Sequence, residues 1–161
     1  DVIQLLRDLL SESKNLSGEE HRIDLEASQS LGLFGNASEL DSAFSNLVFN
    51  AVRYTPAGGA IRLHWWSDQD DAPCFSVSDT GIGIASEHIP RLTERFYRVD
   101  VGRSRRSGGT GLGLAIVKHV MVRHGGYLKI ESEPGKGSTF TCCFPKSRVR
   151  NVAPDLFEVV I

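Results

Sequence analysis

The spacing of apolar residues changes repeatedly between a helical and a strand pattern along this chain, and the order of these patterns restricts the fold. Apolar residues recur at steps of three and four in predicted helices and at steps of two in predicted strands. The predicted helices cover residues 1–14, 38–55, 89–95 and 112 to about 125. The predicted strands cover residues 22–27, 61–66, 74–79, 128–131 and 140–144, with a further short apolar stretch at 31–34.

Most of the predicted strands follow one another as hairpins, and the helices do not alternate strictly with them. This order is typical of an α+β fold and argues against a doubly wound parallel sheet. We therefore expect a two-layer sandwich in which a mixed, mostly antiparallel five-stranded sheet is backed by three helices.

Length and charge exclude several classes of protein. A chain of 161 residues has room for one domain with its own core, and we assign residues 1–146 to that domain and 147–161 to a C-terminal tail. The net charge of −2 and the pI near 6.2 provide no overall basic field for nucleic acid or an anionic membrane. No apolar run reaches the roughly 18 residues that span a bilayer, and residues 1–8 do not resemble a signal peptide.

The cysteines give a further indication of the cellular compartment. Cys74, Cys142 and Cys143 make an odd count without metal-ligand spacing, and the two neighbours should point to opposite faces of a strand. We expect reduced structural thiols in a cytoplasmic setting.

Glycines gather at two places in the chain. Gly81 and Gly83 follow a predicted strand, whereas Gly109, Gly111 and Gly113 lie at the entrance to a predicted helix. Glycines let backbone N–H groups approach an anion, and a helix N-terminus carries about half a positive charge. The second cluster therefore predicts a phosphate-binding loop, with a flexible loop that permits tight helix packing as the alternative.

Asp79 ends a predicted strand on the face that Phe75 and Val77 should bury. A carboxylate in such a place needs a hydrogen-bond donor from the protein or from a ligand such as the exocyclic amine of adenine. Guanine presents an acceptor at that point and would be rejected. A plain Asp-x-Gly turn is the alternative.

Asn46, Asn50 and Arg53 lie on one face of the predicted helix that ends before Pro56. Amide oxygens suit Mg²⁺, and Mg²⁺ that carries ATP phosphates takes few protein ligands. The alternative is an ordinary solvated helix face.

A basic run interrupted by Phe96 and Tyr97 follows. Its arginines are Arg95, Arg98, Arg103, Arg105 and Arg106. Beside a phosphate-binding loop, such a run is typical of a lid that brings guanidinium groups to a triphosphate; alone, it would be a solvated charge run.

Taken in order, these segments resemble the N, first glycine, F and second glycine boxes of sensor histidine kinases. The boxes run from Asn46 to Tyr54, from Asp79 to Gly83, from Arg95 to Arg98 and from Gly109 to Leu114. Within the family, residues 91–98 look most like phosphate-regulon sensor kinases, including Thr93 where most relatives carry Phe.

The resemblance implies the Bergerat ATP-binding fold and the cofactors ATP and Mg²⁺. It implies that Asn50 ligates Mg²⁺ with Asn46 close by, that Arg53, in place of the commoner Lys, meets phosphate, that Tyr54 packs beside adenine, and that Asp79 binds the adenine amine. The residues that it implies for the rest of the pocket and its lid are Gly81, Gly83, Ile84, Phe96, Tyr97, Arg103, Gly109, Thr110, Gly111, Leu112, Gly113 and Leu114. The residues that it implies for catalysis are Asn46, Asn50, Arg95 and Arg98.

Asn46 distinguishes this chain from the gyrase, heat-shock and mismatch-repair ATPases. Those proteins share the implied fold, but they carry a Glu that acts as general base at the position of Asn46. An amide cannot accept a proton from water, so transfer to a better nucleophile is favoured over hydrolysis. A hydrolytic ATPase of that kind and a non-catalytic nucleotide-sensing module are the alternatives.

The phosphate acceptor and the partners are expected outside this chain. None of the five histidines lies in the acceptor motif of the family. The resemblance implies a separate dimerisation domain with the acceptor histidine, a response regulator that takes the phosphate onward, signalling of phosphate limitation, and a parent kinase anchored in the inner membrane.

Overall fold

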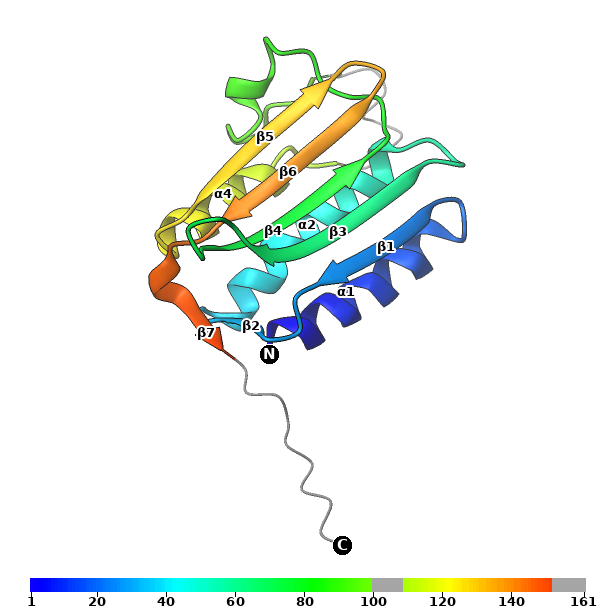
Figure 1. Ribbon diagram of the computed structural model, residues 1–161. Coiled ribbons are helices and arrows are strands. Elements are labelled where there is room, and N and C mark those ends of the chain that lie inside the picture. Colours follow the sequence, from blue (N-terminus) through cyan, green and yellow to red (C-terminus); the bar gives the residue numbers. More distant parts are fainter. Residues whose placement is uncertain (100–108, 152–161) are drawn as a thin grey trace, which may run out of the picture.

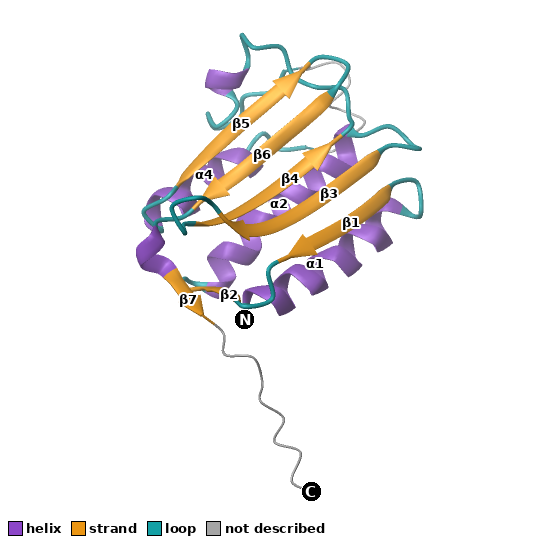
Figure 2. Cartoon of the chain, in the orientation of Figure 1, coloured by secondary structure: helices purple, strands orange, loops and turns teal. Residues whose placement is uncertain are grey.

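A computed structural model describes residues 1–99 and 109–151 as a sheet with helices on one face (Figure 1). The strands of the main sheet are β1 (Arg22–Ala27), β3 (Ala60–Ser67), β4 (Pro73–Asp79), β5 (Tyr127–Glu133) and β6 (Gly137–Cys143). The helices are α1 (Val2–Ser17), α2 (Ala37–Tyr54) and α4 (Gly113–Arg123), and Figure 2 shows all three on the same side of the sheet. The shorter elements are β2 (Leu31–Leu33), η1 (Ile89–Arg91), η2 (Lys146–Arg148) and β7 (Val149–Asn151), of which η1 and η2 are 3₁₀ turns.

The sheet has the strand order β1-β3-β4-β6-β5. Only β1 and β3 run parallel, and the remaining neighbours pair antiparallel. The predicted two-layer α+β sandwich with a mixed, mostly antiparallel five-stranded sheet is therefore confirmed.

The core lies between the helices and one face of the sheet. Strand alternation turns Trp65, Phe75 and Val77 towards the helices, and all three side chains are fully buried. Phe44 of α2 packs on Phe75 with ring centroids 4.2 Å apart. This contact holds α2 against the middle of the sheet. It therefore also sets the orientation of the polar face in the C-terminal half of α2.

The ends of α1 and α2 have clear local causes. The Asp1 carboxylate accepts hydrogen bonds from the N–H groups of Ile3 and Gln4, and Gly18 ends α1 in a left-handed conformation at φ 58°. At the start of α2, the Asn36 side chain accepts a hydrogen bond from Glu39 N–H. Thr55, which precedes Pro56, is extended, as a residue before proline prefers to be.

The predicted helix at 89–95 is wrong for most of its length. Only η1, a single 3₁₀ turn, forms there, and turns follow it up to Phe96, whose φ is 66°. An isolated segment of this length cannot offset the cost of helix nucleation, and its apolar residues find partners in a turn as well as in a helix.

Part of the tail beyond residue 146 forms a strand that the sequence analysis did not predict. In that strand, β7, residues 149–151 pair antiparallel with β2. Leu31 of β2 accepts a hydrogen bond of 2.9 Å from the indole of buried Trp65, which ties the small sheet to the core. Strands of three residues are too short for a periodic pattern to reveal them.

The three cysteines lie in or next to the main sheet. All three thiols are free, with Cys142 buried on the core face and its neighbour Cys143 partly exposed on the other face. Burial raises the pKa of the Cys142 thiol far above its ordinary range, so this thiol stays protonated. Within residues 1–99 and 109–151, no helix is long and apolar enough to cross a membrane.

Candidate nucleotide-binding site

The polar face of α2 meets the start of α4. Asn46 and Asn50 lie on this face and are half-buried. The side-chain Nδ2 of Asn46 donates a hydrogen bond of 2.7 Å to Ser42 O. A Cβ on Gly113, the first residue of α4, would lie only 2.7 Å from Asn46 Oδ1. A larger residue at 113 would therefore push α4 away, and glycine at this position brings the predicted N and second glycine segments together.

The N-terminus of α4 is suited to an anion. Its N-cap residue, Leu112, has no side chain that could accept a hydrogen bond from the first turn. The first backbone N–H groups of a helix have no intrahelical partner, and the helix dipole adds positive charge there. The 11 residues of α4 form three turns, so aligned peptide dipoles add up at this end.

Two arginines converge beside the same glycine loop. A Cβ on Gly109 would lie 2.8 Å from Arg53 Nη1 and 3.1 Å from Arg98 Nη2. Arg53 comes from the last turn of α2, and Arg98 comes from the segment after η1. Two guanidinium groups at one point, close to the start of α4, form a surface that favours a multiply charged anion such as a polyphosphate.

Asp79 ends β4 with its carboxylate on the core side. Its Oδ1 accepts hydrogen bonds from Gly81 N–H at 2.8 Å and from Ser138 N–H at 3.3 Å. Among residues 1–99 and 109–151, no donor reaches Oδ2. Burial raises the pKa of Asp79, and the two backbone hydrogen bonds offset part of that rise. One carboxylate oxygen is thus held in place by the backbone, and the other remains available to a ligand that donates a hydrogen bond.

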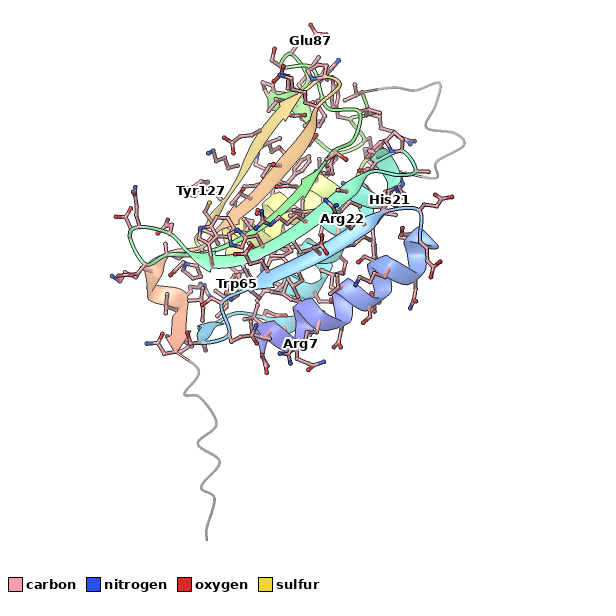
Figure 3. All side chains as sticks on the ribbon, turned by 45° about the vertical axis from the view of Figure 1, so that its right-hand side comes forward. Arg7, His21, Arg22, Trp65, Glu87 and Tyr127 are labelled. Atoms are coloured by element: carbon pink, nitrogen blue, oxygen red, sulfur yellow. The ribbon has the colours of Figure 1, made fainter. Side chains whose placement is uncertain are left out.

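The segment after Asp79 is fixed between two parts of the fold. Ile82 N–H donates to Tyr54 O at the end of α2, and Ile84 N–H donates to the Ser132 hydroxyl of β5 at 2.8 Å. In Figure 3, Glu87 lies at the end of the molecule near the turn between β5 and β6, opposite Tyr127 at the other end of the sheet. These two hydrogen bonds fix the backbone of the segment that follows Asp79.

Gly83 must be glycine for two reasons, and we expect Gly83→Ala to lower stability by much more than Gly135→Ala. Both residues have left-handed φ angles, 69° and 79°, which cost a non-glycine residue about 1–2 kcal/mol. A Cβ at Gly83 would also lie 2.0 Å from Glu133 O, whereas a Cβ at Gly135 meets no atom within 4 Å. The clash should cost about 1–3 kcal/mol more. Urea unfolding of the two variants measures the difference, and equal losses of stability would contradict this packing argument.

The aromatic residues of the predicted F segment have different surroundings. Phe96 is 72% exposed, and its N–H donates to Gly111 O at 2.9 Å. The hydroxyl of Tyr97 instead forms a hydrogen bond of 2.6 Å with His88 Nδ1. A role for Phe96 and Tyr97 in binding nucleotide therefore stays a prediction.

The structure brings most of the predicted site residues to one end of the molecule. Those placed around α2, the start of α4 and the end of β4 are Asn46, Asn50, Arg53, Tyr54, Asp79, Gly81, Gly83, Ile84, Arg98, Gly109, Gly111, Leu112, Gly113 and Leu114. Arg95 and Thr110 are exposed, and Arg103 lies outside the described residues.

Three polar residues that contact this site were missed in the sequence analysis. Ser138 donates its N–H to Asp79, Ser132 holds Ile84, and His88 holds Tyr97. Strand alternation could have revealed Ser138, because it lies on the same face as Phe140 and Cys142. No local signal indicates His88, since its partner lies nine residues away across irregular turns.

Comparison with known proteins agrees with the resemblance to sensor histidine kinases that the sequence motifs indicate. Residues 35–148 match the family described as histidine kinase-, DNA gyrase B- and HSP90-like ATPase. The chain is 58% identical over 149 residues to the phosphate regulon sensor protein PhoR of Pseudomonas aeruginosa, covering 92% of this chain and 33% of that protein. It is 41% identical over 146 residues to PhoR of Haemophilus influenzae, covering 91% of this chain and 34% of that protein. It thus spans about a third of the length of these relatives.

Solved structures agree with the fold. Full-length ShkA in complex with AMPPNP is 28% identical, with a TM-score of 0.81 over 96% of this chain and 31% of that chain. The mycobacterial sensor histidine kinase MprB, at 23% identity, shares the fold with a TM-score of 0.79 over 94% of this chain and 97% of that chain. The chain therefore belongs to the histidine kinase-, DNA gyrase B- and HSP90-like ATPase family, and within that family it resembles the sensor histidine kinases.

Proposed function

We propose that this domain binds Mg·ATP and transfers the γ-phosphoryl group to a histidine on a separate dimerisation domain of its parent kinase. The observation that carries the proposal is the convergence of Arg53, Arg98 and the start of α4 at one end of the fold that also holds Asp79. This arrangement offers cations and backbone donors to a polyphosphate, and a carboxylate oxygen to a base with an exocyclic amine. The site therefore offers partners to the triphosphate of ATP and to its adenine base.

Asn46 favours transfer over hydrolysis. Its Nδ2 donates to Ser42 O, so the amide is held in one orientation on the polar face of α2. An amide at this position cannot act as a general base for an attacking water. Catalysis by the domain is then positioning and charge stabilisation, and the nucleophile comes from elsewhere.

The residues present fit a magnesium ion that is carried by ATP. Among residues 1–99 and 109–151, no group of three or more His, Cys, Asp or Glu side chains could hold a metal by itself. Asn46 and Asn50 offer hard, neutral amide oxygens, and Mg²⁺ commonly takes only one or two protein ligands beside phosphate oxygens. Asn50, with Asn46 close by, would hold the ion, which would neutralise charge on the phosphates.

The chain's own groups would orient the triphosphate. Backbone N–H groups at the start of α4 and the guanidinium groups of Arg53 and Arg98 would bind phosphate oxygens, and Arg95 would add charge at the edge of the site. Asp79 would fix the adenine end at a constant distance from these cations. A bound ATP would then present its terminal phosphate in one direction, which is what an in-line transfer requires.

The acceptor and the later partner lie outside this domain. His124 is 3% exposed, and its two ring nitrogens bond to Asn36 N and Val120 O, so it is a structural residue. The proposal therefore includes an acceptor histidine on the dimerisation domain and a response regulator that takes the phosphate. The identity to phosphate regulon sensor proteins supports signalling of phosphate limitation. The proposal also places the domain in the cytoplasm, as part of a parent kinase anchored in the inner membrane.

The test mixes this domain with the dimerisation fragment of its parent, Mg²⁺ and ATP labelled on the γ-phosphate. We expect label on the acceptor fragment that is stable to base and labile to acid, and almost no free phosphate from the domain alone. Rapid release of phosphate by the domain alone would instead indicate a hydrolytic ATPase. Tight ATP binding without any labelled acceptor would indicate a nucleotide-sensing module.

A further inference from the structure

A cluster of four polar and aromatic side chains lies around η1, and Tyr97 is its one member among the predicted site residues. His88 Nδ1 and Tyr97 Oη are 2.6 Å apart. The guanidinium carbon of Arg91 lies 4.3 Å from the centre of the Tyr97 ring. Arg91 in turn forms an ion pair of 3.2 Å with Glu94. The Tyr97 ring is therefore held at its hydroxyl by one residue and at its face by another.

The backbone reinforces this cluster. Tyr97 N–H donates to Glu94 O at 3.3 Å, and His88 N–H donates to Ala85 O at 3.0 Å, so both partners lie in hydrogen-bonded turns. His88 and Tyr97 are both half-buried. A hydrogen bond between half-buried groups on ordered turns has a defined geometry, unlike a contact between two exposed side chains.

Tyr97 lies between two residues with unusual positions. Phe96 has a φ of 66°, and its Cα would lie 2.9 Å from a Cβ on Gly111. Arg98 packs against the same glycine loop, because its Cγ would lie 3.3 Å from that Cβ and its Nη2 would lie 3.1 Å from a Cβ on Gly109. The chain direction at residues 96–98 therefore determines where the Arg98 guanidinium lies relative to Arg53.

A left-handed φ at a bulky, 72% exposed phenylalanine is not maintained by its own side chain. The conformation has to be maintained by its neighbours. On one side, the N–H of Phe96 is bound to Gly111 O. On the other side, the anchor is Tyr97 in its contact with His88 and Arg91.

We propose that His88 is a positioning residue for phosphate binding, which acts through the Tyr97 hydroxyl to hold the Phe96 backbone and so keeps Arg98 beside Arg53. This proposal rests on the proposed function, since it assigns Arg98 to the phosphates of ATP. Loss of the hydrogen bond releases the turn at residues 96–98, and the cationic pair beside Gly109 becomes less well aligned. The effect falls on the charge-rich terminal phosphates, so ATP loses more affinity than ADP.

The test compares Kd values of ATP and ADP, measured by calorimetry with Mg²⁺, across three variants. Tyr97→Phe keeps the ring and its contact with Arg91 but removes the hydroxyl. His88→Ala removes the partner, and His88→Asn keeps a polar atom near the position of Nδ1. We expect Tyr97→Phe and His88→Ala to lower the preference for ATP over ADP by about fivefold, the effect of one lost hydrogen bond, and His88→Asn to restore most of it.

The matched control is His119→Ala, because His119 is an exposed histidine on α4, and it should leave the preference unchanged. An unchanged preference in Tyr97→Phe and His88→Ala overturns the proposal. An equal loss in His88→Asn and His88→Ala also overturns it, since the hydrogen bond would then not matter. If the unmutated domain binds ATP but labels no acceptor, the proposed transfer fails while the ATP-to-ADP preference still decides the role of His88.

Discussion

Asn50→Ala should abolish the Mg²⁺-dependent part of ATP binding, with a loss of affinity of about 100-fold or more. Asn50 lies one turn beyond Asn46 on the polar face of α2, and the described residues provide no group of three or more His, Cys, Asp or Glu that could replace it as a metal site. Without its amide oxygen, the main protein ligand that would connect Mg²⁺ and its bound phosphates to α2 would be lost. Titration of ATP with and without Mg²⁺ measures the effect.

The control for this variant is Asn15→Ala, which removes an exposed amide from α1. It should bind Mg·ATP like the unmutated domain. Asn50 is only half-buried, so the fold should tolerate alanine and the melting temperature should change little. Unchanged Mg²⁺-dependent affinity in Asn50→Ala would remove Asn50 from the metal site.

Asp79→Asn should lose about 100-fold in ATP affinity, and with it the preference for ATP over GTP. The Asp79 Oδ1 accepts two backbone hydrogen bonds, and an amide oxygen can replace it there. At the other atom, however, an N–H₂ group would face the amine of adenine, so donor would meet donor. Competition between ATP and GTP measures the loss, and equal binding of the two nucleotides by the unmutated domain would already contradict the assignment.

Asp79→Asn should lose ATP affinity, but it should become more stable relative to the unmutated domain as the pH rises. Because burial raises the pKa of Asp79 in the folded protein, the native state keeps this proton at pH values where the unfolded chain has lost it. Stability therefore declines as the pH rises through that interval, and the decline is complete above the raised pKa.

Asp79→Asn has no such group to titrate and should lack this contribution to the decline. We expect urea unfolding between acidic and neutral pH to show that the free energy of unfolding of Asp79→Asn, relative to that of the unmutated domain, increases as the pH rises. A relative stability that falls with pH would show that the carboxylate is stabilising, and would contradict the direction of the shift.

Much of the fold could be predicted from periodicity. The alternation in β3 and β4 predicted a buried face, and Trp65, Phe75 and Val77 are indeed fully buried. The segment at 89–95 could not be predicted in the same way. Its apolar residues fit a helix, but Ile89 lies in a single 3₁₀ turn and Leu92 is buried just beyond that turn. Short segments have little intrinsic preference, so tertiary contacts decide their conformation.

Part of the candidate site could likewise be predicted from local spacing, and part of it could not. Helical spacing alone placed Asn46, Asn50 and Arg53 on one face of α2. It could not show that Gly113 approaches Asn46, or that Arg98 reaches Arg53 beside Gly109. Those approaches depend on how α4 packs on α2 and how the turns after η1 run.

The sequence by itself determined the type of fold, the order of the glycine and polar segments, and the amide at residue 46 that argues against hydrolysis. These are local properties, because helix and strand periods and the chemistry of a side chain are set within a few residues. Only the tertiary structure decided which oxygen of Asp79 remains available, that the beginning of the tail completes a small sheet, and that His88 holds Tyr97. Each of these depends on groups far apart in the chain or joined by irregular turns, where packing and hydrogen bonds, rather than local preference, set the geometry.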